Sequence, residues 1–212
     1  MSPKDYVSLA VGGVGLTVAL FKFAKFLLSR RDKKVVEEAQ KKAIGEDRKY
    51  IFRVINSNYL ALNRLCRIVK ADRITLLEAS FEGPALSKQS NVISTVIYEV
   101  ILQDMPLATP NWKGVNVDEP YVEMLLRVYE DGETTLVFND MPESTLKDSY
   151  AASGVFMSRV FSVLKKPKKF YYLSMNYAEP KIFDDGFRDH VRVTIQEVRT
   201  NIERTEKWIS KP

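Results

Sequence analysis

The pattern of apolar and charged positions separates a leading apolar segment from a mixed remainder. The segment from Tyr6 to Leu28 is YVSLAVGGVGLTVALFKFAKFLL, and it contains no charge before Lys22. In helical form its 23 residues span roughly 35 Å, enough to cross a hydrocarbon core of about 30 Å. We therefore expect residues 1–29 to form a single transmembrane helix. The alternative is an interfacial helix, or an apolar helix buried in an oligomer or a virion.

Basic residues at the end of this segment set its predicted direction. In front of it, Lys4 is offset by Asp5. Because basic residues next to a span tend to stay in the cytoplasm, we expect the N-terminus outside and the rest of the chain on the cytoplasmic side of a membrane. There the basic residues would meet anionic lipid. The membrane-flanking basic residues are Lys22, Lys25, Arg30, Arg31, Lys33 and Lys34.

Helical spacing predicts several helices after the anchor. Residues 30–46 are charged and predict a helical stalk that ends at Gly45, and residues 47–212 then form one folded domain. Apolar residues recur at intervals of three and four in its first and last segments, which places one face of each helix on a core. The predicted helices of the domain cover 48–70, 118–131, 149–164 and 187–209. For 118–131, a β-hairpin across Asp131-Gly132 is the alternative.

Runs of β-branched and aromatic residues between turn signals predict four strands. Pro, Gly and Asp residues bound most of these runs, for example Gly83-Pro84 and Asp140-Met141-Pro142. The predicted strands cover 73–81, 95–102, 134–139 and 170–177. For 95–102, a helical turn is the alternative. Helices and strands in this order predict an α+β domain.

Composition limits the partners and the kinds of site that the sequence predicts. The net charge of +5 lies in residues 1–34, which carry seven Lys and Arg against two Asp and Glu, so the remaining 178 residues carry 25 of each sign. No nucleic-acid partner is therefore expected. The single cysteine, Cys66, and the single histidine, His190, exclude a disulfide framework and predict neither a metal site nor a cofactor.

Three stretches carry a resemblance to a known family. They are ADRITLLEASFEG at 71–83, TTLVFNDMPES at 134–144 followed by GVFMSRVFSVL, and FYYLSMNYAEPKIFDDGFRDHVRVTIQEVRTNI at 170–202. Over residues 47–205 the order resembles a GAF-like domain of the GAF/PAS-type sensory class. The resemblance implies a central antiparallel sheet, with the first and last helices packed together on one face and a small-molecule pocket on the other. No cysteine stands where a linear tetrapyrrole would be attached.

The resemblance implies a sensory, regulatory or protein-interaction role behind a membrane anchor, without catalysis. A partner protein or a homo-oligomer would receive its output, and a pocket on the sheet face opposite the helix pair would hold a small ligand. Residues with suitable side chains on the predicted strands, or at their ends, are the candidates for that pocket. The candidate ligand-binding residues are Tyr98, Glu99, Asp140 and Tyr172.

Two other classes of function are weighed against this one. A phage- or bacterium-encoded single-span membrane protein, holin-like or scaffolding, would use its soluble domain to bind another protein. An enzyme would need a recognisable constellation, yet the sequence shows no Gly-rich phosphate loop and no nucleophile elbow. We therefore expect a non-catalytic protein.

Deleting residues 1–34 is expected to move the protein from the membrane pellet to the supernatant after ultracentrifugation of a cell lysate, because the apolar segment and its basic flank are lost. The intact chain is the control. Recovery of both forms in the same fraction would contradict the predicted anchor.

Overall fold

The computed structural model describes the backbone of residues 33–102, 105–109 and 111–209 and, within these ranges, the side chains of residues 49–207. The predicted anchor, residues 1–29, lies outside the described residues. Among the helices that the structure does describe, none is both long and apolar enough to cross a membrane. The chain divides into two units after Arg53.

Helix α2 runs from Lys33 to Ile68. The prediction that a stalk helix ends at Gly45 is wrong, because Gly45 is an interior residue of this single helix. One glycine costs a helix about 1 kcal/mol relative to alanine, and the flanking Lys, Ala and Glu residues favour the helix enough to offset it. The first unit contains the part of α2 up to Arg53, and the rest of α2 belongs to the second unit.

The second unit is built on one antiparallel sheet in the order β3-β2-β1-β6-β5-β4. Its strands are β1 (Arg73–Phe81), β2 (Val92–Ile101), β3 (Val115–Asn116), β4 (Glu133–Val137), β5 (Met157–Lys166) and β6 (Lys169–Tyr177). All four predicted strands are present, and two strands were missed, the long β5 and the two-residue β3. The central strands β1 and β6 pair from Arg73↔Asn176 to Ser80↔Lys169, so alternate residues of both strands point to opposite faces.

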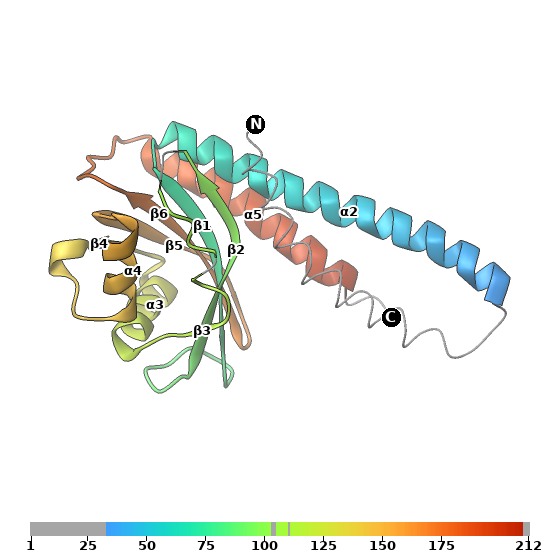
Figure 1. Ribbon diagram of the computed structural model, residues 1–212, viewed down its shortest axis with the longest axis horizontal. Coiled ribbons are helices and arrows are strands. Elements are labelled where there is room, and N and C mark those ends of the chain that lie inside the picture. The colour runs from blue at the N-terminus through green and yellow to red at the C-terminus, as the bar shows by residue number, and fades with distance from the viewer. Residues whose placement is uncertain (1–32, 103–104, 110, 210–212) are drawn as a thin grey trace. The chain divides into compact units, whose positions relative to one another are not determined.

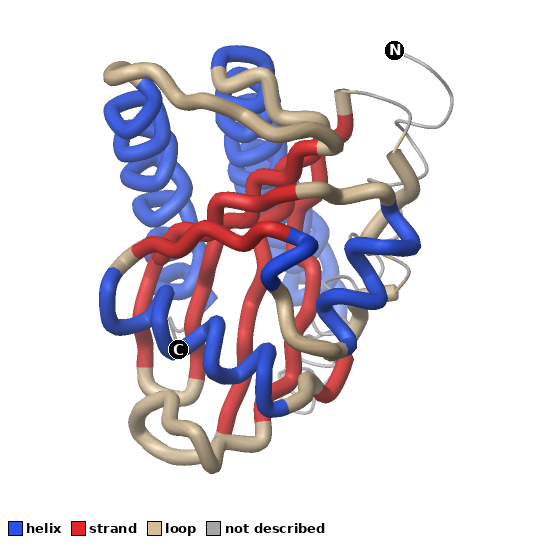
Figure 2. Tube along the Cα trace, turned by 90° about the vertical axis from the view of Figure 1, so that its left-hand side faces the viewer, coloured by secondary structure: helices blue, strands red, loops and turns tan. Residues whose placement is uncertain are grey.

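Helices cover both faces of the sheet. Helix α5 (Phe187–Ile209) and the part of α2 after Arg53 pack on one face, and α3 (Glu119–Asp131) and α4 (Thr145–Ser153) pack on the other (Figures 1 and 2). Each face has its own apolar core. The expected α+β fold, with a central antiparallel sheet and the first and last helices together on one face, is therefore confirmed for the described domain.

Polar contacts fix how α2 and α5 pair. The Asn201 side-chain amide donates to the Asn58 side-chain oxygen at 2.8 Å and to the Ser57 hydroxyl at 3.2 Å. Further along, Arg64 and Glu197 form an ion pair at 3.7 Å. Residue numbers rise along α2 as they fall along α5, so the two helices run antiparallel.

The predicted helix over 149–164 is wrong beyond Ser153. Gly154 adopts a left-handed conformation with φ of 65° and caps α4, because its N–H donates to the carbonyls of Tyr150 and Ala151. The chain then enters β5, where the register shifts between Ser162 and Leu164. A bulge adds one residue to the strand, so apolar residues follow spacings of three and four that imitate a helix.

The helix predicted over 118–131 is confirmed, and the hairpin alternative is not observed. Asp118 caps α3 by accepting from the Tyr121 N–H at 3.3 Å, and Gly132 ends the helix with φ of 90°. The strand predicted over 134–139 is shorter than expected, since β4 gives way to a short 3-10 helix at Phe138–Asp140.

Two leucines of α2 test the helix-pair core. Leu62 is fully buried and Leu60 is 55% exposed. Leu62→Ala is expected to lower the free energy of unfolding by about 2–5 kcal/mol, since it removes buried methyl groups and leaves a cavity. Leu60→Ala should change it by less than about 0.5 kcal/mol. Chemical denaturation measures both, and equal losses would contradict the assigned packing.

Candidate functional site

A small cavity lies between the sheet and the helices α3 and α4. Its volume is about 30 Å³, room for a water molecule or two. Side chains from β1, β2, β5 and β6 form its floor, and α3, α4 and the segment before β3 form its walls. The lining residues are Arg73, Thr75, Leu77, Val96, Ala108, Trp112, Tyr121, Met124, Leu146, Ser149, Tyr150, Val160, Tyr172, Ser174 and Asn176.

The sequence of β6 explains why the floor is polar at one end. The residues of β6 that face the cavity side are Phe170, Tyr172, Ser174 and Asn176, and their polarity rises along the strand. Strand β1 runs antiparallel to it and begins with Arg73, which pairs with Asn176. The two polar ends therefore meet, and the apolar ends fill the core under α3.

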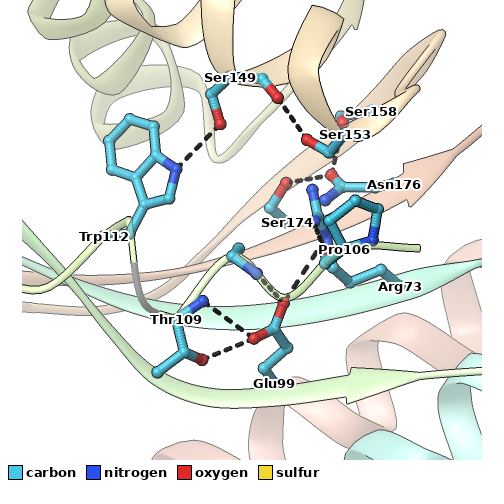
Figure 3. A network of polar contacts seen from close by, with 11 residues as sticks. Arg73, Glu99, Pro106, Thr109, Trp112, Ser149, Ser153, Ser158, Ser174 and Asn176 are labelled. Carbon is cyan, nitrogen blue, oxygen red and sulfur yellow. Dashed lines mark hydrogen bonds and ion pairs between the residues drawn. The ribbon is translucent and has the colours of Figure 1, made fainter.

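Arg73 lies at the centre of a buried polar network (Figure 3). Its guanidinium donates to the Pro106 carbonyl at 2.9 Å. With the Asn176 amide oxygen facing it, Nη2 and Nε also donate to that oxygen at 2.9 and 2.8 Å, and the amide nitrogen donates to Ser174 and Ser158 at 2.8 and 2.6 Å. Burial lowers the pKa of Arg73 from its ordinary value, and the nearby Glu99 carboxylate partly offsets this.

Glu99 holds the segment after β2 against the sheet. Its carboxylate accepts from the backbone N–H groups of Ala108 and Thr109 at 2.7 and 3.0 Å, and from the Thr109 hydroxyl at 2.6 Å. It also pairs with Arg73 at 4.0 Å, and the side chains of both residues are at most 3% exposed. Arg73 and Glu99 together therefore fix residues 106–109 from two neighbouring strands.

A larger groove shares Trp112 with the cavity. The groove has a volume of about 310 Å³ and lies between α4 and residues 106–115. Ala108, Trp112 and Ser149 line both spaces. The Trp112 indole N–H donates to the Ser149 hydroxyl at 3.0 Å. The backbone carbonyl of Trp112 accepts from the Val96 N–H at 2.8 Å. The backbone of Trp112 is thus tied to β2, and Trp112 lines both voids.

Tyrosine hydroxyls continue the polar lining toward α3. Tyr172 hydrogen bonds to the Ser94 hydroxyl at 2.6 Å and to the Tyr121 hydroxyl at 2.8 Å. Burial is the largest cause that raises the pKa values of Tyr121, Tyr150 and Tyr172 above the ordinary tyrosine value. These phenols therefore stay neutral and protonated at physiological pH, and they can donate or accept hydrogen bonds.

The structure brings two of the four predicted ligand-binding residues to this site. Tyr172 lines the cavity, and Glu99 lies beside it in the network of Arg73. Tyr98 instead packs against the helix-pair core on the other face. Asp140 lies in the 3-10 helix, is exposed, and lines neither the cavity nor the groove.

A β-bulge moved Tyr98 away from the predicted pocket. Leu76 pairs with Tyr98 and Leu77 pairs with Val96, so Ile97 is an extra residue. Val96 packs in the cavity-side core and Tyr98 in the helix-side core. Counting every second residue from Val96 would have placed both on one face.

Sequence reasoning did not predict Arg73 or Trp112 as site residues. The sequence did contain a signal for Arg73, which is the first residue of an apolar strand. A charge buried there needs polar partners, because burying it without them is costly. Trp112 lies in a Pro- and Gly-bounded loop, where the sequence gives no packing direction. Of the predicted membrane-flanking residues, Lys22, Lys25, Arg30 and Arg31 lie outside the described residues. Lys33 and Lys34 lie in the first turn of α2.

The donor set of the site favours hydrogen bonding. Hydroxyl, amide, indole and guanidinium groups line the cavity. Within the described ranges, no cluster of three or more His, Cys, Asp or Glu residues could hold a metal ion. Cys66 lies in the helix-pair core on the other face, and burial raises its thiol pKa to about 12. The arrangement can orient a small polar molecule through hydrogen bonds.

Breaking the Arg73–Glu99 pair is expected to be costly. Glu99→Gln should lower the free energy of unfolding by about 3 kcal/mol, because it leaves the buried guanidinium without its counter-charge. Arg73→Met with Glu99→Gln should lose less than the sum of the two single variants. A double-mutant cycle by chemical denaturation measures the coupling, and strictly additive losses would contradict the pairing.

No protein-family model matches the sequence, and no curated protein matches it. Solved structures match in fold. A phycocyanobilin-bound GAF domain from a cyanobacterial phytochrome is 14% identical with a TM-score of 0.52, over 77% of this chain and 95% of that one. A far-red cyanobacteriochrome photoreceptor is 10% identical with a TM-score of 0.54, over 79% and 97%. A cyanobacteriochrome receptor is 12% identical with a TM-score of 0.53, over 74% and 99%. The described domain therefore has a GAF-like fold.

Proposed function

We propose that this chain is a membrane-anchored, non-catalytic regulatory protein whose GAF-like domain binds a small molecule. The observation that carries the proposal is the pair of voids that meet at Trp112, on the sheet face opposite the helix pair. Ligand sites in proteins range from about 300 to 1,000 Å³, and the groove of about 310 Å³ falls at the lower end. The ligand is accordingly small.

The size and chemistry of the site argue against a tetrapyrrole in this chain. One of the similar structures is bound to phycocyanobilin. Here the inner cavity measures about 30 Å³, and the single cysteine of the chain, Cys66, lies in the core on the opposite face of the sheet. A small uncharged molecule suits the site better, because Glu99 already neutralises Arg73 and the remaining lining consists of hydroxyl, amide and aromatic groups.

The central strands offer a route from the site to the helix pair. Tyr172 lines the cavity, and the adjacent residues Tyr171 and Leu173 pack in the core under α2 and α5. A ligand that shifts β6 would move both sets of side chains, because interiors are close-packed. Since α2 continues in sequence toward the predicted anchor, the proposed output is a change in the helix pair at the cytoplasmic side of the membrane.

A second candidate function is protein binding without a small ligand. The observation that favours it is the inner cavity, which side chains fill except for about 30 Å³. In that case the groove between α4 and residues 106–115 would accept a side chain of a partner protein. This alternative fits the single-span phage or bacterial protein considered from the sequence.

The groove is tested by filling it. Ala152 lines the groove, and Ala151 is an exposed neighbour on α4 that does not. Trp208→Phe leaves Trp112 as the single tryptophan of the chain. In that background, a metabolite library is screened for compounds that change Trp112 fluorescence and raise the melting temperature, as binding to the folded state alone requires.

Ala152→Phe is expected to abolish the response to a hit, because the ring occupies the groove, whereas Ala151→Phe should keep it. Retained binding in Ala152→Phe would place the ligand elsewhere. A library without any hit, together with capture of a partner that Ala152→Phe prevents, would favour the protein-binding alternative.

A further inference from the structure

Charge is segregated between the helix pair and the rest of the domain. Residues 71–186, which contain the strands, α3 and α4, carry 11 Lys and Arg against 17 Asp and Glu. Residues 54–70 carry three basic residues and no acidic one, and residues 187–207 carry five basic and four acidic residues. The helix pair therefore has a net charge of +4, and the remainder of the fold has a net charge of −6.

Basic and aliphatic side chains share the outer surface of the helix pair. Leu60 and Ile68 of α2 are 55% and 45% exposed, and Val193 of α5 is 66% exposed. Residues 60, 64 and 68 follow at intervals of four, so they form one stripe along α2. Because Arg64 pairs with Glu197 and the helices run antiparallel, one further turn along each helix brings Ile68 and Val193 to the same side.

This helix-pair surface consists of three aliphatic residues, the basic residues among them and two acidic partners. The side chains of Arg64 and Arg192 are 63% and 80% exposed, and they pair with Glu197 and Asp189 of α5, each at 3.7 Å. Arg67 adds a positive charge that no carboxylate pairs with among the described ion pairs, so the surface keeps a positive excess. Arg67 is also exposed and only bridges to Asn63 within its own helix. The surface residues are Leu60, Arg64, Arg67, Ile68, Arg192 and Val193.

We infer that the helix-pair surface lies against the headgroups of an anionic bilayer. Aliphatic residues set among Arg and Lys are the composition of helices that bind at membrane interfaces. The acidic remainder of the fold would be repelled by the same lipid, so the charge distribution also orients the domain. The inference rests on the proposed anchor, which would bring the domain to a membrane beside the basic cluster Arg30–Lys34.

Charge also decides between this surface and two other occupants. A second copy packed α2 against α2 around a two-fold axis would bring together two helix segments that each carry three basic residues and no acidic one between positions 54 and 70. Glu197 of α5 offsets only Arg64 in each copy. A nucleic acid would match the basic residues but leave the aliphatic ones Leu60, Ile68 and Val193 without apolar contact. An anionic lipid surface accommodates both kinds of side chain.

The test places one fluorophore on each face of the full-length protein in lipid nanodiscs. Cys66 is buried and its thiol pKa is raised to about 12, so an engineered cysteine reacts selectively. Val193→Cys reports on the helix-pair surface, and Asp140→Cys reports on the exposed 3-10 helix. In phosphatidylglycerol discs, quencher-labelled lipid headgroups should quench the fluorophore at 193 and not at 140. In phosphatidylcholine discs, neither should be quenched.

Charge reversal provides the matched comparison. Arg67→Glu with Arg192→Glu should reduce the quenching at 193. Each unit of charge should change the equilibrium constant for contact between this surface and the lipid by about fivefold. Lys113→Glu with Arg127→Glu makes the same change in net charge on other exposed parts of the fold, and should leave the quenching in place. Added salt should weaken the contact.

The experiment tests the surface contact and the anchor separately. Co-elution with phosphatidylcholine discs reports the anchor, and quenching at 193 reports the surface contact, so either can fail alone. Equal quenching at 193 and 140, or none at 193 in phosphatidylglycerol discs, would overturn the inference. A signal at 193 that depends on protein concentration and is the same in both lipids would assign the surface to a second copy instead.

Discussion

The pairing of β1 with β6 is the constraint on which the rest of the domain depends. These two strands lie at the centre of the sheet and contribute alternate side chains to two separate cores. On one side Ile74 and Leu173 pack under the helix pair, and on the other Leu77 and Tyr172 pack under α3 and α4. A register slip of one residue would exchange the two sets. The site and the helix pair are therefore positioned by the same hydrogen-bonded ladder.

The polar end of that ladder is costly to bury, and its polar groups accordingly have hydrogen-bond partners and a counter-charge. Arg73 and Asn176 are paired across the strands, and Glu99 adds the counter-charge from β2. A hydrophobic replacement of such a pair is often as stable as the pair itself, so stability alone does not account for its presence. What the pair adds is a fixed position for residues 106–109, which form a wall of both voids. This is why we regard the network as part of the candidate site.

Local signals predicted most elements, and their limits follow from specific residues. The Asp118 cap and Gly132 delimited α3, and the aromatic run of β6 was visible as a strand. The prediction failed where a bulge changed the spacing, at Ile97 in β2 and near Val163 in β5. One extra residue turned Tyr98 to the helix face and made part of β5 resemble a helix. Bulges depend on pairing with a distant strand, so the local pattern did not reveal them.

The candidate site was harder to predict than the fold for the same reason. Its residues come from β1, β2, β5 and β6 and from α3, α4 and the loop before β3. Tyr172 and Glu99 were named from the sequence as residues of the sheet face opposite the helix pair, together with Tyr98 and Asp140, which lie elsewhere. Trp112 gained its role from the Ser149 hydroxyl 37 positions later, a contact that only the folded chain creates. Periodicity predicts which face of an element a residue occupies, but it does not predict which residues from different elements contact one another there.

The balanced charge of the chain after residue 34 conceals a pattern that the fold makes visible. Averaged along the sequence, basic and acidic residues cancel, and the average gave no preferred partner. In the structure the basic excess lies on the first and last helices, which are adjacent in space although more than a hundred residues apart in sequence. The acidic excess lies in the part of the chain between them. The fold thus converts a neutral sequence into a polarised domain, and the proposed orientation at a bilayer follows from that polarity together with the proposed anchor.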